Sequence, residues 1–304
     1  MRKLLKNLNK YTIALSALSA AALTNADILT SVRPLGFIAS SIADGITETQ
    51  VLIPAGASPH DYSMKPSDAK RVRDAEFVLW IGKDIDAFLE KSIAQRDTTS
   101  VLTISKLAGI ESLLGETSAH DHDHDHHHST NELEQDWHVW FSPKISEQVA
   151  EQLAQQLTQL YPQHQAKIAT NLETFKQQLT TTNQQITQQL AEFKDQGFYV
   201  FHDAYRYFEN AYGLQQTGYF TINPLIAPGA KKLAKIKEEI NEHKVKCLFA
   251  EPQFTPKVLQ TLQQSTNVKI GQLDPMGEKI ALGKGSYSAF LQQIADNFAQ
   301  CLQE

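Results

Sequence analysis

The segment from Pro162 to Phe193 is rich in glutamine and contains no internal glycine or proline. A single α-helix over this segment is about 48 Å long at 1.5 Å per residue. A coiled-coil dimer seam is the alternative, but Thr182 and Gln189 interrupt the apolar stripe and no charge pattern flanks it. We therefore predict one rigid helix over residues 161–195 that lies across two lobes and limits how far they hinge. The stripe, spaced at steps of three, four or seven, consists of Ile168, Leu172, Phe175, Leu179, Ile186, Leu190 and Phe193.

Short apolar runs alternate with helical patterns on both sides of this segment. Strands that alternate with helices predict parallel sheets covered on both faces. The fold class is therefore predicted to be α/β, with parallel-sheet lobes over residues 27–160 and 196–304 bridged by the long helix. In the first lobe the strands are expected at 27–32, 50–54, 76–81 and 100–104, and the helices at 34–43, 67–75 (with Ser67 as N-cap) and 84–94. In the second lobe the strands are expected at 198–201, 216–220, 245–250 and 268–273, and the helices at about 203–212, 229–243, 255–265 and 286–302.

Residues 1–26 have the pattern of a secretory signal peptide. Four basic and no acidic residues precede an apolar run of about a dozen residues and a small-residue end near Ala26. The apolar run is too short to span a bilayer, which takes about 20 residues. No cysteine stands near the expected cleavage point, which disfavours a lipid anchor. We expect the mature chain to be exported.

The charge of the mature chain limits its partners. Without the four basic residues of the leader, 24 basic residues face 34 acidic ones, a net charge of −10 in place of −6. An acidic surface disfavours nucleic acid and anionic membranes and is compatible with a cationic ligand.

The two cysteines, Cys247 and Cys301, lie 54 positions apart. In an oxidising compartment such an isolated pair favours a disulfide over a metal site, because no second ligand stands at short spacing beside either one. In the chain-entropy model, a disulfide that closes a loop of this length raises the free energy of unfolding by roughly 4 kcal/mol. We expect the disulfide to tie the last helix to a strand.

Residues 115–135 contain a run in which histidines alternate with aspartates. Nothing in the run is apolar enough to bury, so it is predicted to be a mobile insertion. Ordering it around a metal costs roughly 1 to 2 kcal/mol of backbone entropy per residue fixed, so we expect a weaker, secondary metal site. The alternative is a solvated linker with incidental affinity. The run holds six of the chain's 11 histidines: His120, His122, His124, His126, His127 and His128.

Three other histidines occupy unusual contexts. His60 follows a predicted strand, His138 stands among aromatic residues in DWHVWFSP, and His202 ends a predicted strand. Ligands collect beyond the carboxyl ends of parallel strands, where the carboxylate of Asp274 also falls. Singly, a histidine there is more often a surface or hydrogen-bonded residue. Together, three imidazoles and one carboxylate suit tetrahedral zinc better than manganese or calcium, with Glu251 either supporting the site or forming a buried ion pair.

Six stretches of the sequence, taken in order, resemble the ZnuA family, the solute-binding components of ABC-type zinc importers. They are GASPHDYSMKPSDAKRVRDAEFVLWIG, DWHVWFSP, FHDAYRYFENAYGL, INPLIAPGAKKL, AEPQFTP and LDPMG, with the histidine-rich loop before the second. The resemblance covers nearly the whole mature chain and implies metal in the cleft between two α/β lobes, a periplasmic location, and a zinc permease in the inner membrane as partner. It places metal ligands on His60, His138 and His202, matches Asp274 to a position that ligates metal in the wider group, and implies a disulfide in the second lobe. Related manganese binders commonly carry a carboxylate where this chain has His202.

The sequence departs from the pattern of the family at one position, which bears on the fourth metal ligand. Some close zinc-binding relatives place a glutamate before the first histidine, whereas this chain has Pro59, so the fourth ligand is either Asp274 or water. The leading interpretation is high-affinity zinc binding by a monomer, without catalysis. The alternatives are an exported zinc hydrolase, for which no H-E-x-x-H occurs, and a binder of manganese, nickel or cobalt. A surface adhesin is disfavoured by the missing anchor cysteine.

Overall fold

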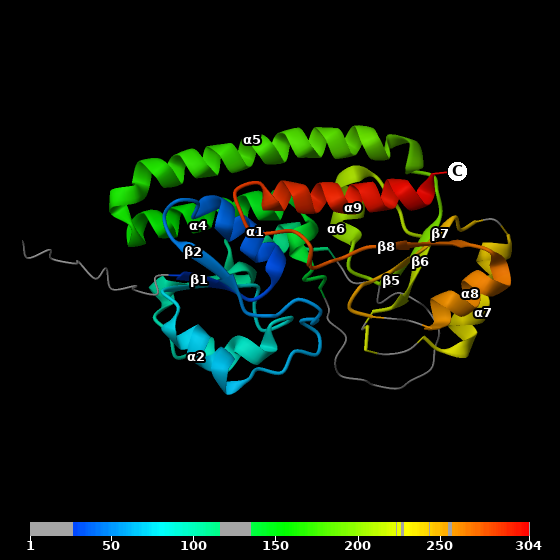
Figure 1. Cartoon of the computed structure of the whole chain (residues 1–304), viewed down its shortest axis with the longest axis horizontal. Coiled ribbons are helices and arrows are strands. Elements are labelled where there is room, and N and C mark those ends of the chain that lie inside the picture. Colours follow the sequence, from blue (N-terminus) through cyan, green and yellow to red (C-terminus); the bar gives the residue numbers. More distant parts are fainter. Residues whose placement is uncertain are drawn as a thin grey trace, which may run out of the picture.

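The structure is a computed structural model that describes residues 27–115, 135–222, 224–225, 228–242, 244–254 and 257–303. The predicted signal peptide (residues 1–26) and the histidine run at 120–128 lie outside the described residues. Two sheets lie side by side beneath a layer of long helices (Figure 1). No helix within the described ranges is both long and apolar enough to cross a membrane.

The first lobe contains a parallel sheet in the order β2-β1-β3-β4. Successive strand residues face opposite sides, so Ile28 and Phe77 pack against one set of helices while Leu29 and Val78 pack against another. Helices α1 and α4 cover the first face and α2 covers the second. The elements are β1 (Asp27–Thr30), α1 (Arg33–Ile42), β2 (Glu48–Val51), α2 (Pro66–Asp74), β3 (Phe77–Trp80), α3 (Glu90–Ile93), β4 (Val101–Thr103) and α4 (Pro143–Leu160).

The second lobe repeats this plan in the order β6-β5-β7-β8, again all parallel. Tyr199 and Leu248 pack under α7 and α8, whereas Phe198 and Phe249 pack under α6 and α9. The two parallel sheets confirm the predicted fold class. The elements are β5 (Phe198–His202), α6 (Arg206–Tyr212), β6 (Gly218–Thr221), α7 (Ala230–Asn241), β7 (Cys247–Ala250), α8 (Lys257–Thr266), β8 (Lys269–Gln272) and α9 (Ser286–Leu302).

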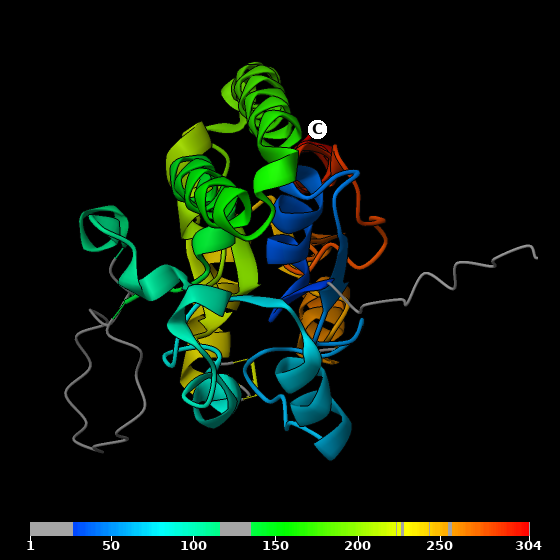
Figure 2. The same cartoon turned by 90° about the vertical axis from the view of Figure 1, so that its left-hand side faces the viewer.

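A long helix, α5 (Gln165–Leu190), runs across both lobes with a 3-10 turn at each end. It contacts α1 and α4 of the first lobe and α6 and α9 of the second, above both sheets (Figures 1 and 2). Thr182, which breaks the apolar stripe in the sequence, is buried on the same face. Asn171 is also buried there and donates to the backbone oxygens of Ile42 and Asp44, both at 2.9 Å. The prediction of one long helix is confirmed.

Helix α4 was not predicted, although its sequence carries the signal. Ser142 caps it by accepting a hydrogen bond from Ile145 N at 3.2 Å, and Pro143 occupies the first turn, where a missing N–H is tolerated. Its buried residues recur every four positions from Ile145 through Val149 and Leu153. The helix packs on α1 and α5 and completes the layer that joins the lobes.

Two helix predictions in the first lobe were wrong in detail. The helix predicted at 84–94 is a 3-10 turn at Ala87–Leu89 followed by the four-residue α3. Helix α2 begins at Pro66, with Lys65 and not Ser67 as its N-cap. Proline fixes φ in the helical range and therefore starts the helix one residue earlier, and the Asp68 carboxylate accepts a hydrogen bond from Lys65 N at 2.8 Å.

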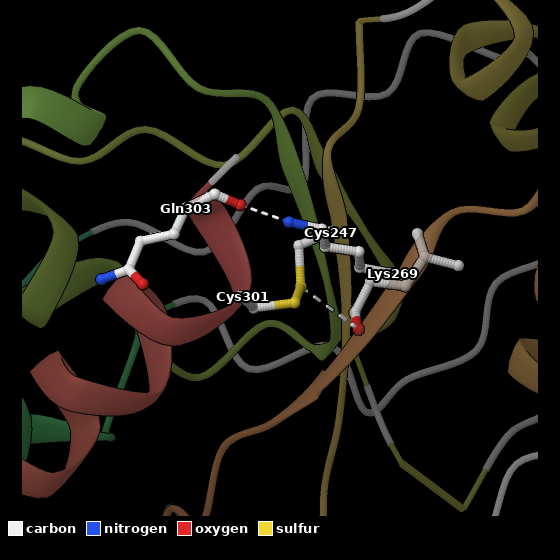
Figure 3. Close-up of a disulfide and its surroundings, with 5 residues drawn as sticks. Cys247, Lys269, Cys301 and Gln303 are labelled. Atoms are coloured by element: carbon white, nitrogen blue, oxygen red, sulfur yellow. Dashed lines mark hydrogen bonds between the residues drawn. A yellow bond between two sulfur atoms is a disulfide. The ribbon is translucent and has the colours of Figure 1, made fainter.

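The predicted disulfide is present between Cys247 in β7 and Cys301 in α9, with a Cα–Cα distance of 6.0 Å (Figure 3). Lys269 in β8 donates a hydrogen bond to the backbone oxygen of Gln303 beside it. The disulfide thus ties the last helix to the middle of the second sheet, as the sequence indicated.

Candidate metal centre

Three histidines from separate segments converge between the lobes. His60 lies in the loop after β2, His138 directly precedes the 3-10 turn at Val139–Phe141, and His202 is the last residue of β5. Their ring centroids are 4.7 to 5.4 Å apart, and one ligand atom from each lies within 4.8 Å of the others. The structure therefore brings together the three imidazoles that the sequence singled out.

The separation of the ring nitrogens suits a tetrahedral ion. His60 Nε2 and His138 Nε2 are 3.3 Å apart. Two nitrogens that each bind one zinc ion at about 2.0 to 2.1 Å with a tetrahedral angle are separated by roughly 3.3 Å. His202 Nε2 is buried and has no hydrogen-bond partner within the described parts of the chain. A buried polar atom without a partner is rare, and a bound cation would satisfy it.

The opposite ring nitrogens face carboxylates. His138 Nδ1 lies 2.7 Å from Asp136 Oδ1, and His202 Nδ1 lies 3.3 Å from Glu251 Oε1. Tyr205 Oη donates to the same Glu251 oxygen at 3.2 Å. A carboxylate at Nδ1 fixes the imidazole tautomer that leaves the Nε2 lone pair available to a metal.

The sequence anticipated one of these carboxylates and missed the other. Glu251 was expected either to support the site or to form a buried ion pair, and it lies against the ring of a proposed ligand. Asp136 was not singled out, although its place two residues before His138 in DWH was a local signal. Both carboxylates are buried.

Burial sets the protonation of the site. His138 and His202 are 5% and 3% exposed, and His60 is partly buried. Burial, reinforced by the neighbouring imidazoles, lowers the pKa of His60 and of His202 well below 6.5, so both rings are neutral at pH 7. Burial raises the pKa of Glu251 to about 8, against the opposing pull of His138 and the Tyr205 hydroxyl. A divalent cation among the rings would favour the ionised carboxylate.

The cavity at the histidines is small. Its volume is about 10 Å³, enough for roughly one water-sized group. Trp140 lines it, and its indole nitrogen donates to the backbone oxygen of Pro275 at 3.0 Å, which holds the ring in place. Trp137 packs in the core and is not among the lining residues. The other apolar lining residues are Pro59, Phe254, Pro275 and Met276.

Asp274 is not part of the histidine group. Its Oδ1 accepts hydrogen bonds from Met276 N at 3.0 Å and Gln253 Nε2 at 3.1 Å, and its Oδ2 accepts one from Glu278 N at 2.7 Å. The carboxylate therefore organises the turn after β8. Its assignment as a fourth ligand stays a prediction, as does any metal binding by the histidines at 120–128, which the structure does not describe.

Comparisons with known proteins show the family of the chain and its fold. Residues 28–301 match the family model described as zinc-uptake complex component A, periplasmic. The high-affinity zinc uptake system protein ZnuA of Haemophilus influenzae is 52% identical over 338 residues, covering 99% of each chain. The corresponding protein of Haemophilus ducreyi is 52% identical over 97% of this chain and 99% of its own. A solved crystal structure of ZnuA has a TM-score of 0.76 at 23% identity and covers 91% of this chain and 99% of its own, a likeness of fold.

Proposed function

We propose a function for this chain from one premise: it belongs to the ZnuA family of periplasmic zinc-uptake components. The chain is a zinc-binding component of a zinc-uptake system. It captures zinc in the periplasm with high affinity and delivers the ion to an ABC-type permease in the inner membrane. The residues before Asp27 are the signal peptide, cleaved near Ala26. Residues 27–160 and 196–304 form the two lobes, and residues 161–195 form the helix that links them.

The observation that carries this proposal is the convergence of three imidazoles on one point. His60, His138 and His202 are the proposed ligands, and the fourth position is taken either by Asp274 or by water. Nitrogen donors at tetrahedral spacing favour zinc over oxygen-seeking manganese or calcium. Because two of the rings are held by buried carboxylates, little reorganisation precedes binding, which favours high affinity.

The size of the cavity argues for binding rather than catalysis. A space of about 10 Å³ has room for roughly one water-sized group, whereas a hydrolase needs room for an organic substrate beside the metal. Residues of both lobes line the cavity, and α5 and α9 hold those lobes together. The proposed role is therefore transport without a chemical reaction, by a monomer with no nucleic-acid partner.

The histidine run at residues 120–128 is proposed as a second, weaker zinc site that captures zinc or reports its abundance, while the cleft holds the transported ion. Its aspartates would offset the positive charge that accumulates as ions bind. The support for this role is composition alone: six imidazoles within nine residues.

Metal analysis of the protein tests the main proposal. The chain is purified without metal-affinity resin, and its zinc content and zinc affinity are compared with those of a variant in which His60, His138 and His202 are all alanine. We expect zinc in the wild-type protein and no tight binding in the triple variant. Retention of tight binding by the triple variant would refute the site.

A further inference from the structure

Gln253 lies in the loop after β7, two residues beyond Glu251, and lines the same cavity as the histidines. Its side-chain nitrogen Nε2 donates two hydrogen bonds to carboxylates. The acceptors are Asp274 Oδ1 at 3.1 Å and Glu278 Oε1 at 2.7 Å. The side chain is therefore held at one end by two anchored acid groups.

These contacts fix which way the amide points. A carboxylate accepts hydrogen bonds, so the NH₂ group must face Asp274 and Glu278, and the amide oxygen must face away from them. That oxygen, Oε1, is buried and has no hydrogen-bond partner among the residues that the structure describes. His202 and Gln253 both line this cavity, and each carries a buried polar atom, Nε2 and Oε1, that has no hydrogen-bond partner among the described residues.

A zinc ion with one water molecule would satisfy both atoms at once. We propose that Gln253 serves the fourth position of the metal centre: its Oε1 accepts a hydrogen bond from a water molecule bound to the zinc ion. This inference rests on the proposed function. A water is favoured over direct ligation by the amide, because protein ligands of zinc are imidazole, thiolate and carboxylate groups.

The same side chain connects the fourth position to the loop that carries His60. Glu278 Oε1, which accepts from Gln253, also accepts from Gly56 N at 2.7 Å. Gly56 has φ of +81°, a left-handed conformation that favours glycine. Glu278 itself is held by its backbone bond to Asp274, and Arg33 of the first lobe donates to the neighbouring Gly277 oxygen at 3.2 Å. Through Glu278, Gln253 therefore connects the zinc-bound water to Gly56, in the loop that carries His60.

The test uses Gln253→Leu, which removes the amide while keeping similar bulk. The matched control is Gln263→Leu on the exposed face of α8. The full-length mature protein is loaded with Co²⁺, whose visible absorption reports the number and type of ligands, and zinc affinity is measured by competition with a chelator. We expect an altered Co²⁺ spectrum and roughly tenfold weaker zinc binding for Gln253→Leu, by analogy with other outer-shell partners, and neither change in the control.

A second variant distinguishes the effect of Gln253 Oε1 from that of the hydrogen bond between Gln253 and Glu278. Glu278→Ala removes one carboxylate and the Gly56 contact but leaves Gln253 Oε1 in place, so faster zinc release with a wild-type Co²⁺ spectrum is expected. The unfolding temperature of each metal-free variant shows that it folds. A wild-type spectrum and wild-type affinity for Gln253→Leu would overturn the inference, as would the same spectral change in Glu278→Ala. Either result leaves zinc binding by the wild-type histidines intact, so it is distinguishable from failure of the proposed function.

Discussion

Asp136 Oδ1 lies 2.7 Å from His138 Nδ1 and also accepts a hydrogen bond from His138 N at 2.9 Å, so one carboxylate oxygen fixes both the ring and the backbone of the same residue. The backbone of Asp136 is itself anchored. Tyr207 Oη, from the second lobe, donates to Asp136 O at 2.7 Å, and Asp136 N donates to Gly115 O at 3.1 Å. His138 is thus positioned by contacts that reach both lobes.

Removal of this carboxylate should weaken zinc binding without removing a ligand. For Asp136→Ala we expect zinc affinity to fall by about 10- to 100-fold, because the His138 ring loses the partner that fixes its tautomer and direction. Asp136→Asn keeps an acceptor oxygen and should lose less. Asp195→Ala, at an exposed position, is the control. Chelator competition measures all three, and equal affinities for Asp136→Ala and wild type would contradict an orienting role.

Loss of a proposed ligand should have a larger effect. His60→Ala, His138→Ala and His202→Ala are each expected to lower zinc affinity by more than about 100-fold, which exceeds the effect of an outer-shell partner. His164→Ala, at the junction of α4 and α5, should leave affinity unchanged. Isothermal titration of the four variants compares them directly. A His164→Ala variant that loses as much affinity as the others would show that the loss does not come from this site.

The dependence of zinc affinity on pH follows from the lowered pKa values of His60 and His202. Protons compete with zinc for the ring nitrogens only below the pKa of each ring. Glu251 adds a second effect, because its pKa of about 8 means that binding of the cation at pH 7 releases its proton. We therefore expect affinity to fall gently below pH 8, with a slope of about one proton, and to fall more steeply only in acidic solution, where the rings take up protons. A titration series across this range measures the profile, and a steep decline that begins above pH 7 would count against buried, neutral rings.

The lowered pKa of His60 also affects the stability of the metal-free protein. The unfolded chain takes up a proton on His60 as pH falls through about 6.5, whereas the folded chain does not, so the wild type loses stability relative to His60→Ala on acidification. The difference in free energy of unfolding should change by up to about 1.4 kcal/mol per pH unit below pH 6.5. Denaturant unfolding of both proteins at pH 7 and pH 5 checks this sign. A difference that does not depend on pH would mean that His60 titrates normally.

The disulfide should support the fold and have little influence on the site. Cys247 begins β7, whereas Glu251 follows the opposite end of that strand, near the metal centre. Replacement of both cysteines by serine is expected to lower the free energy of unfolding by roughly 2 to 4 kcal/mol, with zinc affinity nearly unchanged. Denaturation of the wild type with and without a reductant provides the matched comparison. Identical midpoints would show that the disulfide contributes no stability.

Deletion of residues 119–128 tests the histidine run. We expect the number of zinc ions bound per chain to fall while the tightest binding step keeps its affinity, because the preformed cleft does not depend on the run. Calorimetric titration of both forms gives the stoichiometry. Unchanged stoichiometry would remove any binding role for these histidines.

Periodicity predicted most of the fold because the relevant signals are local. Most strand cores, the long helix α5 and the last helix α9 stand where apolar spacing placed them. The strand expected at 50–54 is an exception, because β2 spans Glu48–Val51 and its residues are partly exposed. Helix α4 was missed although its Ser-Pro start and four-residue spacing were readable. The helix expected at 84–94 did not form in full because tertiary contacts, including burial of Leu89, favoured a 3-10 turn.

The candidate site was only partly predictable. His60 and His202 could be found because each follows or ends a strand, and parallel strands bring their carboxyl ends to one edge. The place of Asp274 in the ligand set stays a prediction, and in the structure its carboxylate accepts hydrogen bonds from backbone N–H groups of its own turn. The orientation of Gln253 depends on two acids that approach it only in the folded protein.

The three proposed ligands differ in the secondary structure that supports them. His202 belongs to a strand and His138 adjoins a 3-10 turn, but His60 sits in a stretch without regular structure between β2 and α2. We therefore expect exchange of the ion to involve rearrangement of the short segment that carries His60, without a large rotation of one lobe against the other. Zinc binding of this kind buries little new apolar surface, so it should show a small change in heat capacity. A protein whose lobes close around the ligand would show a larger one.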